Sequence, residues 1–575
     1  MPHQSTISNQ QSAINRFWPW AAAVLSGVLL TLCFAPWNQG WLCWIALTPL
    51  IAAAFSSGGP LKKAALGYVT GVIFFASTFW WLNTLAALYR NPLLLAIPVL
   101  LALFFGLYFA FWSWFVGAVL TRLPGTRSFD RSLVNLGIGA AGASAWLLHE
   151  WVRERLFGGF GWNPLGVALH RDIPMIQIAE LTGVPGLSWL VIFTNLMAVI
   201  IIRRIIGELG PTFLKRVRWE FSATMALIAG VFTFGLRAIF SPDPAPTVPF
   251  LVTAIQPNVA QDEKFDRAAD ERVLREIDHL TSLALIAQPA PHLVLWPESA
   301  IPGGVYGSQQ GHDFVRTQAG RGDFGLLFGT TDFDPAAGED YNGALLLFGQ
   351  AQQDKIDQLA GHPPGVLRGQ FHRKMHLVPF GEYLPARPLL GPLVGGLIPG
   401  DFTPGTEFTL LDLPLHPPGP TSQPSPLLDI RLRLAPLVCF EDTLGDLTRR
   451  FVVKGADVLV NITNDGWFAQ SPAAEQHLAN AALRAVENRR PLIRCGNTGV
   501  TCLVLPSGHI ERWLPPFQQG FAAREVRVAT AARQTFYTRH GDWLTALSAA
   551  IVLLAGTLAW RAGSARQSLG NASIN

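Results

Sequence analysis

The sequence predicts two kinds of structure in one chain: a multi-span α-helical membrane domain, and an α/β domain that precedes a last transmembrane helix. The chain has 575 residues, more than one domain usually holds. Half of the residues are hydrophobic and only 14% are charged, a composition typical of a protein embedded in a bilayer. From about residue 248, however, the sequence changes to short apolar runs separated by turns.

Eight apolar runs are candidates for membrane-spanning helices, because roughly 20 helical residues cross the hydrocarbon core of a bilayer. The longer runs lie near 17–36, 64–82, 93–120, 133–151, 182–202, 221–240 and 543–560. The run at 41–55 is shorter, and we count it as a span because an even number of helices reconciles the charges of the connecting segments. The sequence therefore predicts eight spans.

Basic residues in the connecting segments predict the orientation of these spans. With a cytoplasmic N-terminus, the cytoplasmic segments contain Arg16, Lys62, Lys63, Arg122, Arg127, Arg131, Arg203, Arg204, Lys215, Arg216, Arg218, Arg561 and Arg566. The opposite short loops contain Arg90, Arg153, Arg155 and Arg171, diluted by Glu150 and Glu154. By the positive-inside rule, the long segment 241–542 then lies outside the cytoplasm. A cleaved signal peptide is the alternative for the first span, but its apolar core is too long and no small-x-small site follows it.

Charge and cysteine content argue against several kinds of partner and site. The net charge of +4 is small for this length, and the basic residues lie between helices rather than on one helical face. We therefore expect no nucleic acid partner. The five cysteines lack paired or metal-ligand spacing, which argues against a disulfide framework and a zinc site. We expect no metal or other cofactor, and at least one free thiol.

The middle segment alternates β-type runs with helical patterns, which indicates an α/β fold with a largely buried sheet. The β-type runs are Phe250–Ile255, Leu293–Trp296, Gly325–Gly329, Ala344–Phe348, Leu434–Cys439 and Val458–Ile462; helical patterns cover Ala268–Ala287 and Ala473–Asn488. Proline-rich stretches at 241–249 and 412–426 indicate a linker and a surface loop. We expect a transmembrane domain over 1–241, an α/β domain over 248–535 and a closing transmembrane helix over 543–560.

Glu298 is a candidate general base. The apolar run Leu293–Trp296 leads directly into Pro297 and Glu298, and α/β sheets place their chemistry at the carboxyl ends of strands. Partial desolvation there raises the pKa of a carboxyl group toward that of a base working near neutral pH. The alternative is a helix N-cap or a solvated turn residue.

Lys374 is a candidate for stabilising an oxyanion. It lies in a ten-residue segment, 373–382, that also contains a rigid Pro-Phe-Gly turn and a second carboxylate, Glu382. A fixed ammonium stabilises negative charge on an oxygen, and Glu382 would hold that ammonium or interact with Glu298. The alternative is a basic surface strand followed by an ordinary turn.

Cys439 is a candidate nucleophile, because it ends an apolar run and is followed by Phe440, Glu441 and Asp442. A cysteine at a strand end beside a cation can act as a thiolate, whereas a cysteine in a core is usually inert. The other cysteines are weaker candidates: Cys33 and Cys43 lie in predicted spans, and Cys495 and Cys502 lie in apolar, strand-like surroundings.

The order Glu298, Lys374, Cys439, with the segments WPES, KxHLVPFGEYLP and VCFED, resembles the carbon-nitrogen hydrolase (nitrilase) superfamily. With a multi-span membrane region beside it, the chain resembles specifically the apolipoprotein N-acyltransferase family over nearly its whole length. The resemblance implies a nitrilase-like αββα sandwich outside the cytoplasm. It also implies that Glu298, Lys374 and Cys439 are catalytic and that Glu382, Phe440 and Glu441 support them.

The activity implied by the resemblance is a two-step acyl transfer. An acyl chain passes from a membrane phospholipid to Cys439 as a thioester, and then to the α-amino group of the diacylglyceryl-modified N-terminal cysteine of an apolipoprotein. No metal or nucleotide is required, and neither has a motif in the sequence. The implied location is the bacterial inner membrane, with several spans and a periplasmic catalytic domain.

The sequence departs from the family at Phe440, where a tyrosine is common, so we expect aromatic packing there and no role for a hydroxyl. Segment 464–468 and residues Arg484, Glu487, Arg490 and Pro491 match features that support the family's fold, and we expect structural roles for them. Two other functions remain open: a membrane-tethered amidase or nitrile hydrolase that uses water as acceptor, and a receptor that binds lipoproteins without catalysis.

Overall fold

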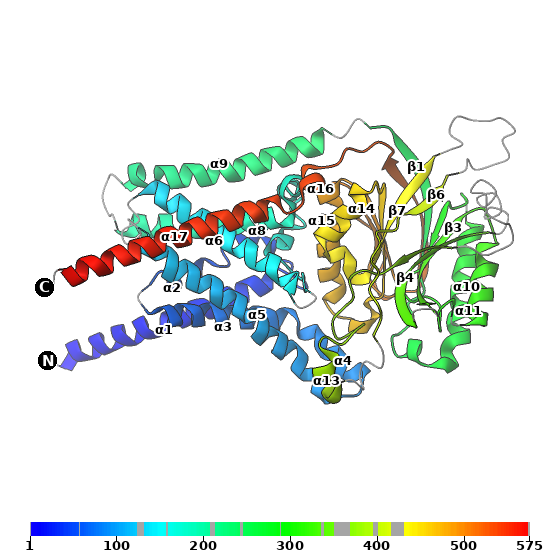
Figure 1. The fold of residues 1–575 in the computed structure, drawn as a ribbon, viewed down its shortest axis with the longest axis horizontal. Coiled ribbons are helices and arrows are strands. Elements are labelled where there is room, and N and C mark those ends of the chain that lie inside the picture. Colours follow the sequence, from blue (N-terminus) through cyan, green and yellow to red (C-terminus); the bar gives the residue numbers. More distant parts are fainter. Residues whose placement is uncertain are drawn as a thin grey trace.

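The computed structural model describes residues 2–56, 58–123, 131–156, 159–207, 213–241, 245–287, 289–306, 308–334, 338–349, 369–394, 401–415 and 430–572. Arg127, used above for the orientation, and residues 416–426 of the predicted surface loop lie outside these ranges. The described chain has two parts. A bundle of long helices, here called the helical region, lies beside a region of sheets and shorter helices, here called the α/β region (Figure 1).

The helical region is built mainly from the first 240 residues and the last helix. Its helices are α1 (Pro2–Leu32), α2 (Thr48–Ala54), α3 (Pro60–Thr78), α4 (Thr84–Leu88), α5 (Ile97–Trp114), α6 (Ser132–Arg153), α7 (Ile173–Ile176), α8 (Ala179–Gly207), α9 (Phe213–Phe240) and α17 (Trp543–Ala572). Both chain ends lie at the end of the bundle that is distant from the sheets (Figure 1).

Fewer helices meet the length and composition of a membrane span than the sequence analysis predicted. In the described residues, four do so: Pro92–Arg122, Ala179–Ile206, Trp219–Phe240 and Trp543–Ala565. The pair Pro60–Thr78 and Trp80–Leu88 would be a fifth span, bent by 54°. The predicted span at 41–55 is wrong as a continuous helix, because a 3-10 turn over Gly40–Trp44 is separate from the short α2.

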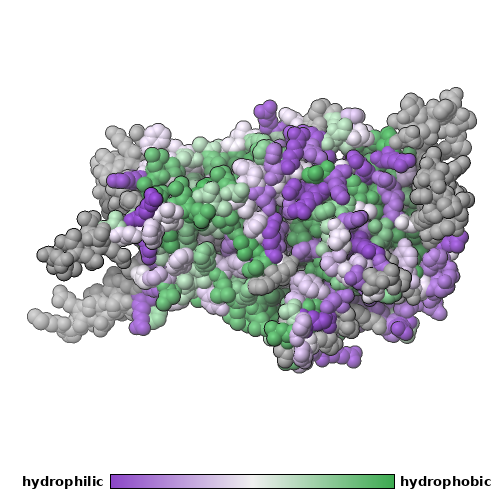
Figure 2. All heavy atoms as spheres, viewed as in Figure 1, coloured by the Kyte–Doolittle hydropathy of each residue, from purple (hydrophilic) through white to green (hydrophobic). Residues whose placement is uncertain are grey.

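The surface of the two regions differs as their sequences do. Hydrophobic residues gather over the helical region, and hydrophilic residues over the α/β region (Figure 2). Large apolar side chains such as Leu100, Leu107 and Leu553 are more than half exposed on the long helices. An aqueous surface rarely carries so extended an apolar belt, so the helical region has the character of a membrane domain.

The α/β region contains two six-stranded sheets. The first has the order β12-β1-β2-β3-β4-β5 and the second β11-β10-β9-β8-β7-β6. The strands are β1 (Thr247–Gln256), β2 (Leu293–Leu295), β3 (Gly325–Asp334), β4 (Glu339–Phe348), β5 (Gln370–Arg373), β6 (Leu411–Pro414), β7 (Arg431–Val438), β8 (Val458–Thr463), β9 (Leu492–Gly496), β10 (Thr501–Val504), β11 (Ile510–Leu514) and β12 (Gly520–Ala529). The central strands β1, β2 and β3 are parallel, as are β7, β8 and β9.

The two sheets pack face to face and carry helices on their outer faces. Residues of both sheets, such as Val252 and Val460, share one buried core. The first sheet is covered by α10 (Asp270–Ile286) and α11 (Gln309–Ala319), and the second by α14 (Gly445–Val453) and α15 (Ala473–Asn488). The prediction of an αββα sandwich is therefore confirmed.

The α14–α15 layer is the one that contacts the helical region (Figure 1). Phe440, Leu483 and Val486 belong to the same buried apolar cluster as residues of α3, α5 and α8. Two short helices, α13 (Arg387–Val394) and α16 (Phe536–His540), complete the α/β region. As a result, the turn that follows β7 lies against the membrane-type helices and not on the outer, hydrophilic side.

A glycine in β3 provides a test of how tightly the sheet packs against the turn after β2. A Cβ added at Gly329 would lie 2.5 Å from the Glu298 Cα atom and 3.0 Å from the Ser299 nitrogen. Gly329→Ala is therefore expected to cost roughly 1–3 kcal/mol, measured as a lower melting temperature in detergent. Gly230→Ala in α9, where the added carbon meets nothing within 4 Å, is the control. Equal melting of the two variants would contradict this packing.

Candidate active site

Glu298 lies in the turn after β2, where the sequence analysis placed it. Its side chain is almost buried, at 6% exposure. Its carboxylate accepts hydrogen bonds from the Asn342 side-chain amide (3.0 Å) and the Asn464 backbone N–H (3.1 Å). Ser299, the next residue, has a φ of +50°, a conformation that non-glycine residues seldom adopt. The carboxylate is thus held in one orientation by groups from both sheets.

Lys374 follows β5 and is buried, with 1% exposure. Its Nζ atom lies 2.8 Å from Glu382 Oε1 and 3.6 Å from Glu298 Oε1. Burial alone would lower the pKa of Lys374, but the two carboxylates outweigh that effect and raise the pKa above its ordinary value. The side chain is therefore an ammonium throughout the physiological pH range.

Cys439 begins the turn after β7, in a 3-10 helix over Cys439–Thr443. Its backbone φ is +53°, and its carbonyl oxygen accepts hydrogen bonds from the Asn461 side chain (3.0 Å) and is 3.3 Å from His477 Nε2. Burial raises the pKa of the Cys439 thiol well above its ordinary value; Glu298 raises it further, and Lys374 opposes them. Glu298 and Lys374 thus form an ion pair at 3.6 Å, and both charges act on the Cys439 thiol.

Glu441 connects the turn of Cys439 to the segment that follows Lys374. Its carboxylate accepts hydrogen bonds from the backbone N–H groups of Met375 (2.7 Å), His376 (3.1 Å) and Val438 (2.8 Å). Burial raises the pKa of Glu441 to about 7, against these stabilising donors. Glu441 therefore joins the turn of Cys439 to the segment after Lys374 through three backbone hydrogen bonds.

Phe440 packs between aromatic rings of the two regions. Its ring is stacked on those of Phe160 (5.5 Å between centroids), Trp162 (6.1 Å) and His376 (5.7 Å). The expectation of an aromatic packing role at this position agrees with these contacts. A hydroxyl is not needed for any of them.

Asn342 is a site residue that the sequence analysis missed. Its side-chain nitrogen donates to Glu298 Oε1 (3.0 Å) and to Glu382 Oε1 (2.7 Å), and its backbone carbonyl accepts from the Lys374 backbone N–H (2.7 Å). It thus fixes the two carboxylates and the lysine relative to one another. The signal in the sequence was weak: Asn342 lies just before the apolar part of β4, Ala344–Phe348, and a buried amide there requires partners.

A second missed group is a buried charge network beneath Cys439. Arg494 pairs with Asp442 and with Asp465 (3.0 Å), and His477 lies 2.7 Å from Asp442 and 2.9 Å from Asp465. Burial opposes ionisation of Asp465, but Arg494 and His477 outweigh it and hold its pKa well below the usual range. The network supports the expected structural role of segment 464–468.

Arg484, Glu487 and Arg490 on and after α15 also have structural contacts, as expected. Arg484 donates to the Thr443 carbonyl (3.0 Å) and pairs with Glu487 (2.9 Å). Glu487 accepts from the Val184 backbone N–H (2.9 Å), at the break in α8. Arg490 binds backbone carbonyls, including that of Ala456 (2.9 Å). Of the three, Glu487 binds the helical region, whereas the contacts of Arg484 and Arg490 lie within the α/β region.

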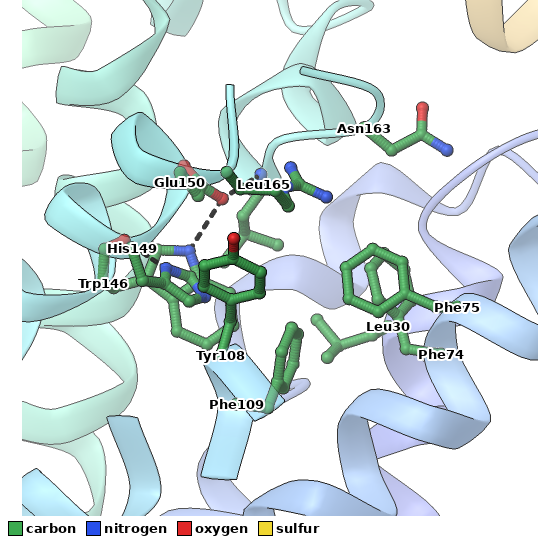
Figure 3. Close-up of a pocket in the computed structure, with 11 residues that line it drawn as sticks. Leu30, Phe74, Phe75, Tyr108, Phe109, Trp146, His149, Glu150, Asn163 and Leu165 are labelled. Carbon is green, nitrogen blue, oxygen red and sulfur yellow. Dashed lines mark hydrogen bonds between the residues drawn. The ribbon is translucent and has the colours of Figure 1, made fainter. Parts of the chain in front are cut away.

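A small cavity lies in the helical region, at the C-terminal end of α6 (Figure 3). Apolar side chains, among them Phe75 and Phe109, form much of its wall, and Glu150 lies at its polar side. Glu150 accepts hydrogen bonds from Trp146 Nε1 (2.8 Å) and the Leu165 backbone N–H (2.7 Å). The described lining residues do not include Glu298, Lys374 or Cys439, so this cavity is distinct from the candidate active site.

Comparisons with known proteins match both regions of the chain. A family model described as the apolipoprotein N-acyltransferase N-terminal domain matches residues 26–197, and one described as carbon-nitrogen hydrolase matches residues 251–536. A Geobacter metallireducens protein named apolipoprotein N-acyltransferase is 34% identical, over 92% of this chain and 94% of its own. A Ralstonia nicotianae protein of the same name is 31% identical, over 94% and 93%.

The raised pKa of Cys439 predicts how its reactivity depends on pH. Only the thiolate is alkylated, and below the thiol pKa the thiolate fraction rises about tenfold per pH unit. The rate of Cys439 alkylation by iodoacetamide, followed by mass spectrometry of its peptide, is therefore expected to keep rising beyond pH 9, the ordinary thiol pKa. A rate that levels off below pH 7 would show a thiol already ionised at rest.

Proposed function

We propose a catalytic mechanism for this chain, which belongs to the apolipoprotein N-acyltransferase family and is an acyltransferase. In this mechanism Glu298 is the general base, Lys374 stabilises the oxyanion and Cys439 is the nucleophile. The acyl donor is a membrane phospholipid. The acceptor is the α-amino group of the diacylglyceryl-modified N-terminal cysteine of an apolipoprotein.

In the first half-reaction Cys439 becomes acylated. Glu298 takes the thiol proton, and the sulfur attacks the carbonyl carbon of a phospholipid acyl ester. The resulting oxyanion is stabilised by the Lys374 ammonium together with a backbone N–H of the turn. Collapse of this intermediate breaks the ester C–O bond, Glu298 returns the proton to the leaving oxygen, and a lysophospholipid departs.

In the second half-reaction the acceptor amine attacks the thioester. The same ammonium stabilises the second oxyanion, and Glu298 accepts the proton that the amine loses. When the C–S bond breaks, an amide is formed and the protonated thiol is regenerated. Neither half-reaction requires a metal or a nucleotide, because covalent catalysis divides the transfer into two steps of the same kind.

The observation that supports this mechanism best is the position of the Lys374 ammonium. It lies between Glu298 and Glu382 and interacts electrostatically with Cys439. A buried cation beside a nucleophile and a base is the arrangement that acyl transfer through an oxyanion needs. The side chain cannot move away easily, since Glu382 is itself held by Asn342 (2.7 Å) and the Val378 N–H (2.8 Å).

We also propose a location and a division of labour within the chain. The protein spans the bacterial inner membrane, with its catalytic domain, residues 248–535, on the periplasmic side. Residues 1–241 and the closing helix 543–560 form the membrane domain. The stacking of Phe440 on Phe160 and Trp162 supports this division, because it places the nucleophile next to the membrane-type helices, where both lipid substrates are found.

The proposed mechanism predicts a covalent intermediate. Purified protein in detergent, incubated with labelled phospholipid, is expected to carry one acyl group on Cys439, detected by mass spectrometry and discharged by a diacylated lipopeptide. Cys439→Ala removes the adduct, whereas Cys502→Ala, which changes a buried cysteine in β10, retains it. An adduct discharged faster by water than by lipopeptide would indicate a hydrolase. A protein that is never acylated would favour a binding function.

The roles of Glu298 and Lys374 predict different losses in the same assay. Glu298→Gln removes the base and is expected to slow single-turnover acylation by roughly 10²–10⁴-fold. Lys374→Met removes the oxyanion cation and is expected to slow it by roughly 10²–10³-fold. Arg373→Met, which changes the neighbouring half-exposed side chain, is the matched control and should react at the wild-type rate. Equal rates for all three variants would argue against these roles.

A further inference from the structure

We propose that Gln476, in the first turn of α15, is a positioning residue that couples the helical region to the backbone of the nucleophile. The inference rests on the proposed role of Cys439. It concerns how the nucleophilic turn is held, and not which groups react. Three sets of contacts lead to it: those of Gln476, those of His477, and those of Trp162.

Gln476 is buried, at 1% exposure, and its amide binds three separate segments of the helical region. Trp81 Nε1 (3.2 Å), Trp162 Nε1 (2.9 Å) and Asn163 Nδ2 (3.2 Å) donate to its Oε1 atom, while its Nε2 atom donates to the carbonyl oxygens of Ala35 (2.9 Å) and Thr78 (3.3 Å). Every donor and acceptor site of this amide is occupied, so its position is strongly determined.

His477, the next residue, reaches the opposite way, toward the nucleophile. Its Nε2 atom lies 3.3 Å from the Cys439 carbonyl oxygen and 2.7 Å from Asp442. Burial and Arg494 disfavour its protonation, but Asp442 and Asp465 outweigh them and raise the pKa of His477. The same His477 nitrogen thus contacts both the carbonyl of Cys439, a residue with a positive φ, and the carboxylate of Asp442.

Trp162 provides a second connection between Gln476 and the residues around Cys439. Its indole N–H donates to Gln476, and its ring lies parallel to the ring of Phe440, with an angle of 2° between them. The same ring is 5.2 Å from the His477 ring. Trp162 therefore contacts Phe440, the residue after the nucleophile. It also contacts His477, which lies near the Cys439 carbonyl, and the amide of Gln476.

The backbone of Cys439 needs such support, because a non-glycine residue at positive φ costs of order 1–3 kcal/mol and persists only where its surroundings enforce it. Asn461 holds the carbonyl from within the second sheet. The second contact to this carbonyl comes from His477. Because Gln476 precedes His477 and is bound by the helical region, this contact depends on that region. Release of Gln476 would let the first turn of α15 shift, and the Cys439 turn would lose the geometry required for attack.

The test is the single-turnover rate of Cys439 acylation by phospholipid vesicles in Gln476→Met, a variant of similar size without hydrogen-bonding groups. The rate is expected to fall at least tenfold, while the lipid concentration that gives half the maximal rate stays within twofold. Gln318→Met in α11 is the matched control. Gln318 is also a buried amide, bound to Asp278 (2.6 Å) and Arg321 (2.8 Å), and its variant should react at the wild-type rate.

A second variant tests the path of the coupling and serves if Gln476→Met does not fold. Trp162→Phe retains a ring on Phe440 but loses the N–H donated to Gln476. It is expected to slow acylation, and the double variant is expected to be no slower than Gln476→Met alone, because both remove one shared interaction.

Three results would overturn the inference. In folded Gln476→Met, the acylation rate could stay within twofold of wild type, or its decrease could be explained entirely by weaker lipid binding. In the double variant, the rate decreases caused by Gln476→Met and Trp162→Phe could multiply. None of these results would affect the proposed function, which fails separately if wild-type Cys439 is not acylated.

Discussion

The buried ammonium of Lys374 is the constraint on which the arrangement of this site depends. A charge removed from water is very costly unless it is paired and hydrogen-bonded. Here Glu382 and Glu298 supply the pairing, and Asn342 orients both carboxylates. Any movement of one member would leave another charge buried without its partner, so the group is held as a unit.

This unit requires both sheets of the sandwich. Glu298 and Lys374 follow strands of the first sheet, β2 and β5, whereas Cys439 follows β7 of the second. The cross-links lie along the seam: Glu441 from the second sheet binds the backbone after Lys374, and the Asn464 N–H binds Glu298. The site therefore forms only when the inner faces of the two sheets are packed together. Loss of that packing would disrupt both the α/β fold and the arrangement of Glu298, Lys374 and Cys439.

Much of the fold and of the candidate site could be predicted from the sequence, and the predictions that were wrong or missing have physical reasons. The strand ends that carry Glu298 and Cys439 can be recognised in the sequence because apolar runs stop there. The bounds of α15, Ala473–Asn488, match the helical pattern predicted for this segment. Asn342 was missed because it lies inside a strand, where only the fold reveals its partners. The 41–55 run was misjudged because hydropathy measures apolar content, and an apolar segment can also be a turn and a short helix packed within a bundle.

The aromatic rings around Phe440 explain why phenylalanine suits this position, where the family resemblance suggests a tyrosine. The ring is enclosed by Phe160, Trp162 and His376, and stacked rings interact through their faces. Loss of a hydroxyl leaves those faces unchanged, so the packing that joins the two regions is preserved. In the proposed mechanism, the same apolar rings would keep water from the carbonyl that Cys439 attacks. A dry surface favours an amine held in place over a diffusing water molecule, which is the discrimination that an acyltransferase built on a hydrolase fold needs.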